Sequence, residues 1–280
     1  MRDRSAVPVR RRRLIGVTAM TAAVVVAVPL GQSAIAASGG SATAGTAAVD
    51  INSNVEPIDL NLQGESPLVV APPEIGTDTD TSDVAFEYLD SSLIVDVDET
   101  EAFRYDGGLS ADSNTNSTSL TLLGELMFTA GQIGSSVLCP TEIEPAGGGI
   151  AEAADVDLGG GPVSLAAGES TSYSFSFESP YFDPNSASAD LHAETIVAQG
   201  DDGENDATGL LVEVSINGTP LGVGDGPFPG IITGSVIIAA SFCSPDGLAN
   251  TGPASTGILL LAGVMLLAAG SSALVWTRRR

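Results

Sequence analysis

A two-residue period of hydrophobicity runs through the middle of this chain and restricts what it can fold into. Apolar residues occupy every second position in 93–97, 173–177 and 210–216. Successive side chains of a strand point to opposite faces, so these segments are expected to place one face on a core. No long segment between 50 and 250 has the 3.6-residue period of a helix. Further strands are predicted at 84–89, 101–105, 119–129, 135–139, 191–198 and 231–243.

Several short strands joined by glycine-rich turns favour an antiparallel β-sandwich of the Ig-like or jelly-roll-like kind. We predict that this mainly β domain spans residues 83–246. Residues 37–82 are predicted to be a flexible, low-complexity or extended leader, because 37–49 is rich in Ala, Ser, Gly and Thr and several prolines follow. That leader has room for one docked edge strand at 68–70. Two Gly triplets predict a long mobile loop over 145–162.

Residues 1–36 have the order of a secretory signal peptide. A cluster of arginines at 10–13 precedes an uncharged, mostly apolar run over 14–30, which is the predicted signal helix. Ala34 and Ala36 supply small residues at the two positions that a signal peptidase inspects. Cleavage is therefore predicted after Ala36, with Ala37 as the first residue of the mature chain. The alternative is that this segment remains as a permanent membrane anchor.

A second uncharged apolar run extends from Gly257 to Trp276 and predicts a C-terminal transmembrane helix. As a helix it would be about 30 Å long, which is the thickness of bilayer hydrocarbon. Residues 277–280 form a basic tail, and positive residues beside a span tend to stay in the cytoplasm. With an exported N-terminus, this orientation leaves the middle of the chain outside the cell.

A pentapeptide lies just before this span, in a linker over 247–256, and reads Leu248-Ala249-Asn250-Thr251-Gly252. The order of pentapeptide, apolar span and basic tail resembles the sorting signal of sortase-anchored cell-wall proteins of Gram-positive bacteria. Ala249 stands where proline is commoner in that family. The pentapeptide is similar to the LAxTG form that is associated with class E sortases of high-GC, actinobacterial-type species. A simple single-span membrane anchor would explain the span and the tail, but not the pentapeptide.

That resemblance implies a partner enzyme and a chemistry. In the family, a sortase cysteine thiolate attacks the carbonyl carbon of the threonine in the signal, here Thr251. Gly252 and the residues after it leave with the membrane helix. An amine of a peptidoglycan precursor then resolves the thioester, so that Thr251 becomes amide-linked to the wall. The implied partners are signal peptidase, a class E-like sortase, the precursor amine and, before sorting, the membrane.

The mature segment 37–251 is strongly acidic. Of the 35 acidic residues only Asp3 lies outside it, and of the ten arginines only Arg104 lies inside it. The chain has no lysine, so 34 carboxylates face one arginine and the mature charge is −33. Such a charge argues against binding of nucleic acid or of anionic lipid, and it favours solubility and attraction of divalent cations.

Both cysteines, Cys139 and Cys243, lie in the exported segment. An even number of cysteines in an oxidising compartment predicts a disulfide between them. It would close a loop of about 105 residues and contribute ~4.7 kcal/mol in the chain-entropy model. Two buried free thiols are the alternative.

One acidic loop is a candidate cation site. Calcium takes several oxygen ligands, often from a single loop with a glycine at its sharp turn, and Gly203 supplies such a turn. The spacing lacks the Glu that an EF-hand requires beyond the glycine, so a merely solvated acidic loop is the alternative. No other cofactor is implied. The candidate calcium ligands are Asp201, Asp202, Glu204 and Asp206.

No catalytic residues are predicted, and the leading hypothesis is a wall-anchored surface protein with a structural, adhesive or ligand-binding ectodomain. His192, the sole histidine, is expected on the same side of a strand as Glu194, as a surface or structural residue. A catalytic triad or a zinc site needs more partners than these. The alternatives are a surface hydrolase that uses two carboxylates, an acidic cation-binding coat protein, and a single-span membrane protein.

Overall fold

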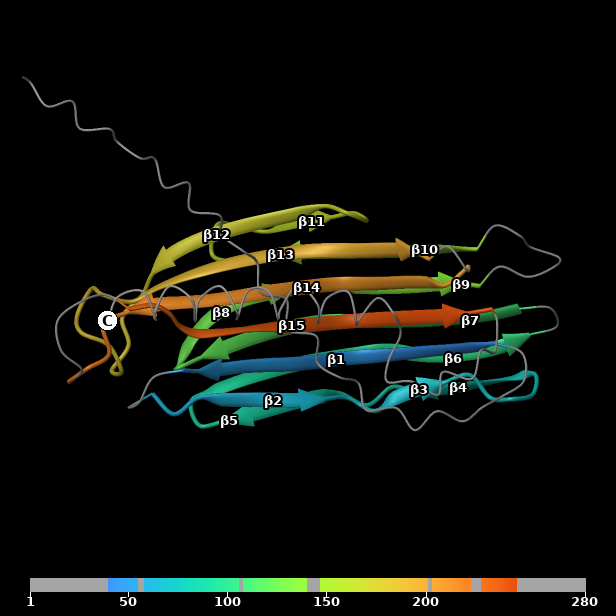
Figure 1. The fold of residues 1–280 in the computed structure, drawn as a ribbon, viewed down its shortest axis with the longest axis horizontal. Helices are drawn as coiled ribbons and strands as arrows, with labels where there is room; N and C mark the ends of the chain where they lie inside the picture. Colours follow the sequence, from blue (N-terminus) through green and yellow to red (C-terminus); the bar gives the residue numbers. More distant parts are fainter. Residues whose placement is uncertain are drawn as a thin grey trace, which may run out of the picture.

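The computed structural model describes residues 40–54, 58–105, 108–139, 147–200, 203–222 and 228–245. Every regular element in these ranges is a β-strand. The strands form two sheets that face each other as the layers of a sandwich (Figure 1). The prediction of a mainly β, antiparallel sandwich is therefore confirmed. The predicted signal helix and transmembrane helix lie outside the described residues.

We name the two sheets after a central strand of each. The β15 sheet contains, in spatial order, β12 (Ser170–Ser176), β13 (Ser188–Gln199), β14 (Asn205–Gly218), β15 (Phe228–Ser244), β1 (Ser41–Ser53) and β2 (Asn61–Glu65), with β3 (Leu68–Val70) also paired to β1. The β7 sheet contains, in spatial order, β11 (Val163–Leu165), β10 (Gly148–Val156), β9 (Ile133–Leu138), β7 (Gly108–Leu122), β6 (Ser91–Tyr105) and β4 (Gly76–Asp80), with β5 (Val84–Tyr88) paired to β6 and β8 (Glu125–Ala130) paired to β7.

The prediction of a leader over 37–82 is wrong where the chain forms β1, a 13-residue strand in the interior of the β15 sheet. β1 pairs with β15 along its whole length and with both β2 and β3 on its other side. Its alanines and glycine produce no strong apolar period, yet Ala42 and Ala44 are buried because this end of the core consists mainly of small side chains. The folded domain therefore begins near residue 41 and not at residue 83.

The predicted mobile loop over 145–162 is also wrong, because half of it, Gly148–Val156, forms the strand β10. β10 pairs with β9, from Gly148 opposite Leu138 to Ala153 opposite Ile133. A Cβ atom on Gly149 would lie 3.0 Å from a methyl carbon of Val197, which belongs to the opposite sheet. Glycine is thus present here because the two sheets approach closely, and not because the chain must move.

The predicted strand 119–129 is in fact two strands joined by a tight turn. β7 ends at Leu122 and β8 begins at Glu125, and the two residues between them, Leu123 and Gly124, have φ angles of 53° and 82°. Two successive positive φ angles are typical of the type I′ turn that matches strand twist. Leu123 is buried in the core. Because this residue is apolar, the sequence pattern did not indicate a turn at its position.

The core is divided into two clusters along the strand direction. The larger cluster consists of aliphatic and aromatic side chains such as Met127 and Phe128. The smaller cluster is mostly alanine and includes Cys139 and Cys243. Small side chains let the sheets approach closely at that end, whereas bulkier ones fill the rest of the interior.

Buried hydroxyl groups join the two sheets between these clusters. Thr46 Oγ1 of β1 lies 2.8 Å from Thr100 Oγ1 of β6, which lies 3.1 Å from Ser113 Oγ of β7. Ser135 Oγ of β9 lies 2.7 Å from Ser241 Oγ of β15. Each hydroxyl has a hydrogen-bond partner, so this hydroxyl layer is buried without the cost of an unpaired polar group. The layer also specifies how the sheets align.

The strands reverse their inward faces at the level of the hydroxyl layer. In β1 the buried core residues are even-numbered at Ala42 and Ala44 and odd-numbered at Val49 and Ile51. β15 makes the corresponding change at Ala239, whose φ is 54°. A local irregularity of this kind changes which side chains face the core. Both core clusters consequently lie between the same two sheets.

Candidate functional site

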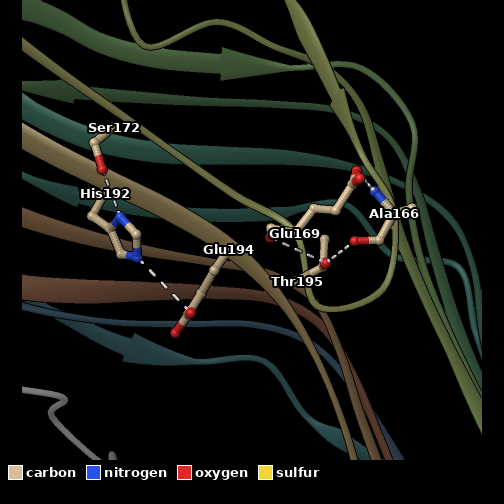
Figure 2. Close-up of polar contacts among 6 residues, drawn as sticks. All are labelled: Ala166, Glu169, Ser172, His192, Glu194 and Thr195. Atoms are coloured by element: carbon tan, nitrogen blue, oxygen red, sulfur yellow. Dashed lines mark hydrogen bonds and ion pairs between the residues drawn. The ribbon is translucent and has the colours of Figure 1, made fainter.

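His192 lies on the outer face of the β15 sheet, near the β12 edge. In the strand register it stands between Ser172 of β12 and Glu213 of β14. Ser172 Oγ is 2.7 Å from His192 Nδ1, and His192 Nε2 is 3.9 Å from Glu194 Oε2 (Figure 2). His192 and Glu194 therefore share one side of β13, as predicted. We call these four residues the His192 cluster.

Two members of the His192 cluster, Ser172 and Glu213, were not predicted from the sequence. They lie on different strands from His192, and only the register of β12 and β14 brings them beside it. The alternation of the strands predicts that all of these side chains face outward. The alternation does not indicate which residues become neighbours across two paired strands.

The His192 cluster has the residue types of a Ser–His–acid triad but not its spacing. A nucleophile and its base need a hydrogen bond of about 2.6–3.2 Å, and a further group must orient the base. The contact between Ser172 and His192 meets that requirement. The 3.9 Å separation from Glu194 is too long for a hydrogen bond and is an ion pair only when the ring is protonated. The cluster can therefore bind a ligand through polar contacts, and it lacks the geometry of an activated nucleophile.

The carboxylate of Glu213 is partly withdrawn from water. Burial raises the pKa of Glu213, while His192 lowers it and Glu194 raises it. Within the described part of the chain, its buried Oε1 atom has no hydrogen-bond partner. Because these groups are close together, a change in the charge of His192 alters how readily Glu213 ionises.

The turn between β11 and β12 is attached to β13 by Thr195 (Figure 2). Thr195 Oγ1 donates to Ala166 O at 2.5 Å, and the N–H of Thr195 donates to Glu169 O at 3.0 Å. Glu169 Oε2 accepts from the N–H of Ala166 at 2.8 Å. A shallow, open hollow of ≈ 350 Å³ lies beside this turn and is lined by Val163, Ser164, Leu165, Glu169, Ser170 and Thr171. None of the four residues of the His192 cluster lines it, so the cluster and the hollow do not form one enclosed site.

Carboxylates that cluster in the sequence at 78–83 are used in local structure. Asp80 Oδ1 accepts from the N–H of Ser82 at 2.9 Å, and hydrogen bonds from Ser82 lower the pKa of Asp80. Asp83 Oδ1 accepts from the N–H of Val97 at 3.1 Å, which connects the segment before β5 to β6. These contacts stabilise turns and do not point toward a common ligand.

Acidic side chains also gather on the outer face of the β7 sheet. Glu101 of β6 stands opposite Asp112 of β7. Burial raises the pKa of Glu101, and the charges of Glu99 and Asp112 raise it further. In the ranges that the structure describes, no group of three or more His, Cys, Asp or Glu side chains could hold a metal ion.

Only part of the predicted calcium loop is described. Asp201 and Asp202 lie outside the described residues, so the calcium site stays a prediction. Asp206 belongs to β14 and stands opposite Phe242 of β15. Burial raises the pKa of Asp206 to about 6. Ser244 Oγ donates to Glu204 Oε1 at 3.5 Å.

Cys139 and Cys243 form the predicted disulfide, with their Cα atoms 5.7 Å apart. Cys139 follows β9 in the β7 sheet, and its N–H donates to Leu109 O at 3.0 Å. Cys243 lies in β15, opposite Ala42. The disulfide therefore joins the two sheets within the alanine-rich end of the core.

The residues predicted for processing lie outside the described residues: Ala34, Ala36 and Ala37 at the signal-peptidase site and Leu248, Ala249, Asn250, Thr251 and Gly252 in the pentapeptide. The folded domain occupies the interval between them. β1 begins at Ser41, four residues after Ala37, and β15 ends at Ser244, four residues before Leu248. Across the described ranges, no helix is long and apolar enough to cross a bilayer; residues 257–276, where a span is predicted, are not among them.

The chain matches no known protein family, and no curated protein is similar to it in sequence.

Proposed function

We propose that this chain is an exported surface protein, cleaved by signal peptidase after Ala36 and attached to peptidoglycan at Thr251 by a class E-like sortase. One observation carries the proposal: the described fold fills the interval between the two processing sites. A sortase must hold its signal as an extended peptide in a groove. A pentapeptide that begins four residues beyond the end of β15 can be held in that way without unfolding the strand.

The disulfide supports export. Structural disulfides form and persist in oxidising compartments outside the bacterial cytoplasm. The bond between Cys139 and Cys243 joins two different sheets, so it belongs to the folded architecture. The predicted helices at 14–30 and 257–276 are the signal helix and the transient membrane span of this proposal.

In this proposal the ectodomain acts by surface contact and without turnover. The outer face of the β15 sheet carries an ordered array of polar side chains that bond one another. Asp190 accepts from Ser174 Oγ at 2.6 Å and from Asn217 Nδ2 at 2.8 Å. Asp50 accepts from Gln63 Nε2 at 2.9 Å. Such an array suits a structural or adhesive domain of the Ig-like or jelly-roll-like kind, which is the finer fold class that we propose.

Mass spectrometry of wall fragments tests the anchor. Cell walls of the producing bacterium are digested with muramidase, and the released peptides of this protein are analysed. The expected C-terminal peptide ends at Thr251 and carries a peptidoglycan amine. Recovery of the protein only in the detergent-extracted membrane fraction, with its tail intact, would refute wall attachment and leave a single-span membrane protein.

A pair of threonine variants makes this test specific. Thr251→Ala changes the residue whose carbonyl carbon the sortase attacks, and is expected to abolish the wall-linked form. Thr256→Ala changes a threonine that lies beyond the predicted cleavage site in the same linker, and is expected to leave the wall-linked form at its normal level. Equal wall linkage in both variants would contradict the assignment of Thr251.

A further inference from the structure

β12 forms an open edge of the β15 sheet. It pairs with β13 over seven residues, from Ser170 opposite Glu194 to Ser176 opposite Ser188 (Figure 1). Among the described strands, none pairs with its other side. A strand in this position presents a row of backbone N–H and C=O groups that can pair with another strand.

The other sheet edges carry features that discourage pairing. β2 and β3 lie on one edge and are separated by Ser66 and Pro67. β4 and β5 lie on another and are separated by residues 81–83. β11 has three residues and follows Pro162. Short strands, interruptions, charges and prolines are the usual protections of a sheet edge. The charged side chains on the β4–β5 edge are Asp78, Asp80 and Glu87.

β12 has none of these protections. Its sequence from Ser170 to Ser176 contains no proline and no charged residue, and its pairing with β13 shows no register shift. The nearest acidic residues, Glu169 and Glu178, flank the strand. In a chain with a net charge of −25, an edge strand without charged residues adds no repulsion of its own to the approach of another acidic molecule.

The sequence of β12 is also self-complementary. If two copies pair antiparallel with Tyr173 at the centre, Ser170 stands opposite Ser176 and Ser172 stands opposite Ser174. Serine then faces serine along the outer face, where these small side chains meet across the axis without crowding. On the inner face the ring of Tyr173, which is 37% exposed and stacks on Phe175, would be covered by its symmetry mate.

We propose that two copies of this protein associate through β12, as antiparallel strands about a two-fold axis at Tyr173. The two seven-stranded sheets then become one continuous sheet. Because each molecule has a single edge without protection among its described strands, the contact closes as a dimer and does not propagate into a filament. The negative charge of each copy makes the dimer weaker at low ionic strength, since salt screens the repulsion between the domains.

Charge pairs introduced across the proposed axis test both the contact and its register. In this register Ser170 of one copy meets Ser176 of the other. The double variant Ser170→Glu/Ser176→Glu places like charges opposite each other twice. The double variant Ser170→Lys/Ser176→Glu places opposite charges together in the same two pairs. Thr77→Glu/Thr79→Glu adds the two acidic charges to the β4 edge and serves as the control.

The full-length chain is purified in mild detergent, and its protein mass is measured by light scattering after size exclusion at about 0.1 M and about 1 M NaCl. We expect the native chain and the control to have twice the chain mass at the higher salt concentration. The Glu/Glu variant should raise the dimer Kd by roughly tenfold or more, and the Lys/Glu variant should retain the dimer. Circular dichroism checks that each variant keeps its β-structure.

Three results would overturn the proposal. The first is a monomeric native chain at both salt concentrations. The second is a dimer that the Glu/Glu variant leaves unchanged, because the contact would then lie elsewhere. The third is equal loss of the dimer in the Glu/Glu and Lys/Glu variants, because the antiparallel register would then be wrong. None of these results depends on whether the protein is linked to the cell wall.

Discussion

Ser41 and Ser244 lie opposite each other in the antiparallel pair of β1 and β15, so the first and last described strands meet at one end of the sandwich. Cys243 is the neighbour of Ser244, and its disulfide to Cys139 crosses to the other sheet. If the chain is held at Thr251, tension enters β15 at Ser244 and passes through this covalent bond into the β7 sheet. The end of β15 and the disulfide therefore lie at the same end of the domain.

Removal of the disulfide is expected to destabilise the domain strongly. The bond joins residues 104 apart in sequence. Closing a loop of that length contributes about 4–5 kcal/mol in the chain-entropy model, and Cys139→Ser/Cys243→Ser should lose about that much free energy of unfolding. Chemical denaturation of the variant and the native protein, each with and without reductant, measures the effect. Reductant should destabilise the native protein alone, and an equal response of the two proteins would contradict the prediction.

Arg104 is expected to stabilise the start of β1. It is the only Lys or Arg between residues 40 and 245, and its guanidinium donates to Pro72 O and to Gly40 O, both at 2.9 Å. Arg104→Met removes these donors and should cost about 1–2 kcal/mol of unfolding free energy. Arg104→Lys should recover only part of that loss, because one ammonium group does not reproduce the fork of the guanidinium. Denaturant midpoints of the three proteins test this order, and equal stability of all three would contradict it.

Asp206 is expected to reduce stability at neutral pH. Burial raises its pKa from 3.8 to about 6, so between these pH values the folded state binds more protons than the unfolded state. The free energy of unfolding therefore falls as the pH rises through this window. Asp206→Asn removes the free-energy cost of burying this ionised carboxylate. The variant should be more stable than the native protein by up to about 3 kcal/mol at pH ~7.5, with little difference near pH ~3.5.

Urea denaturation at both pH values measures this difference. Asp98→Asn removes the same charge from an exposed position of β6 and provides the control. A gain of stability that is equal in the two variants would be a general effect of net charge, and would contradict a special role for the burial of Asp206.

The hydroxyl layer should be sensitive to the loss of one member. Thr100 Oγ1 lies between Thr46 Oγ1 and Ser113 Oγ, so Thr100→Val leaves two buried hydroxyls without this partner. We expect a loss of about 1–3 kcal/mol, with part of it recovered by adding Thr46→Val, because that change removes one unpaired group. Thr79→Val on the exposed β4 edge should stay within about 0.5 kcal/mol of the native protein. Thermal or urea denaturation compares the four proteins, and a double variant that is no more stable than Thr100→Val would contradict the coupling.

Much of the β-structure could be predicted from the sequence, because alternation reports which face of a strand is buried. The segments around Leu93, Phe175 and Val212 have that alternation and are strands in the structure. β1 and β10 were not predicted, because their apolar alternation is weak. Their alanines and glycines pack where the sheets approach closely, and small side chains produce the same local pattern as a flexible linker.

The candidate site was only partly predictable. His192 and Glu194 are two residues apart, and the period of a strand alone places them on one side. Ser172 and Glu213 reach His192 through the pairing of β13 with its two neighbours, which depends on contacts between residues that are distant in sequence. The acids at 78–83 lie close together in the sequence, but Asp80 and Asp83 bond to different backbone groups.

By itself the sequence determined the antiparallel β class, the strongly acidic character, the pairing of the only two cysteines and the position of the pentapeptide beside an apolar run. These properties depend on composition, local period or order along the chain. The tertiary structure alone decided that β1 lies in the interior of a sheet, that the inward faces reverse at the hydroxyl layer, and that β12 is left as an uncharged edge. Those properties depend on register and on packing between sheets, and a local pattern of residues does not encode which distant strand becomes a neighbour.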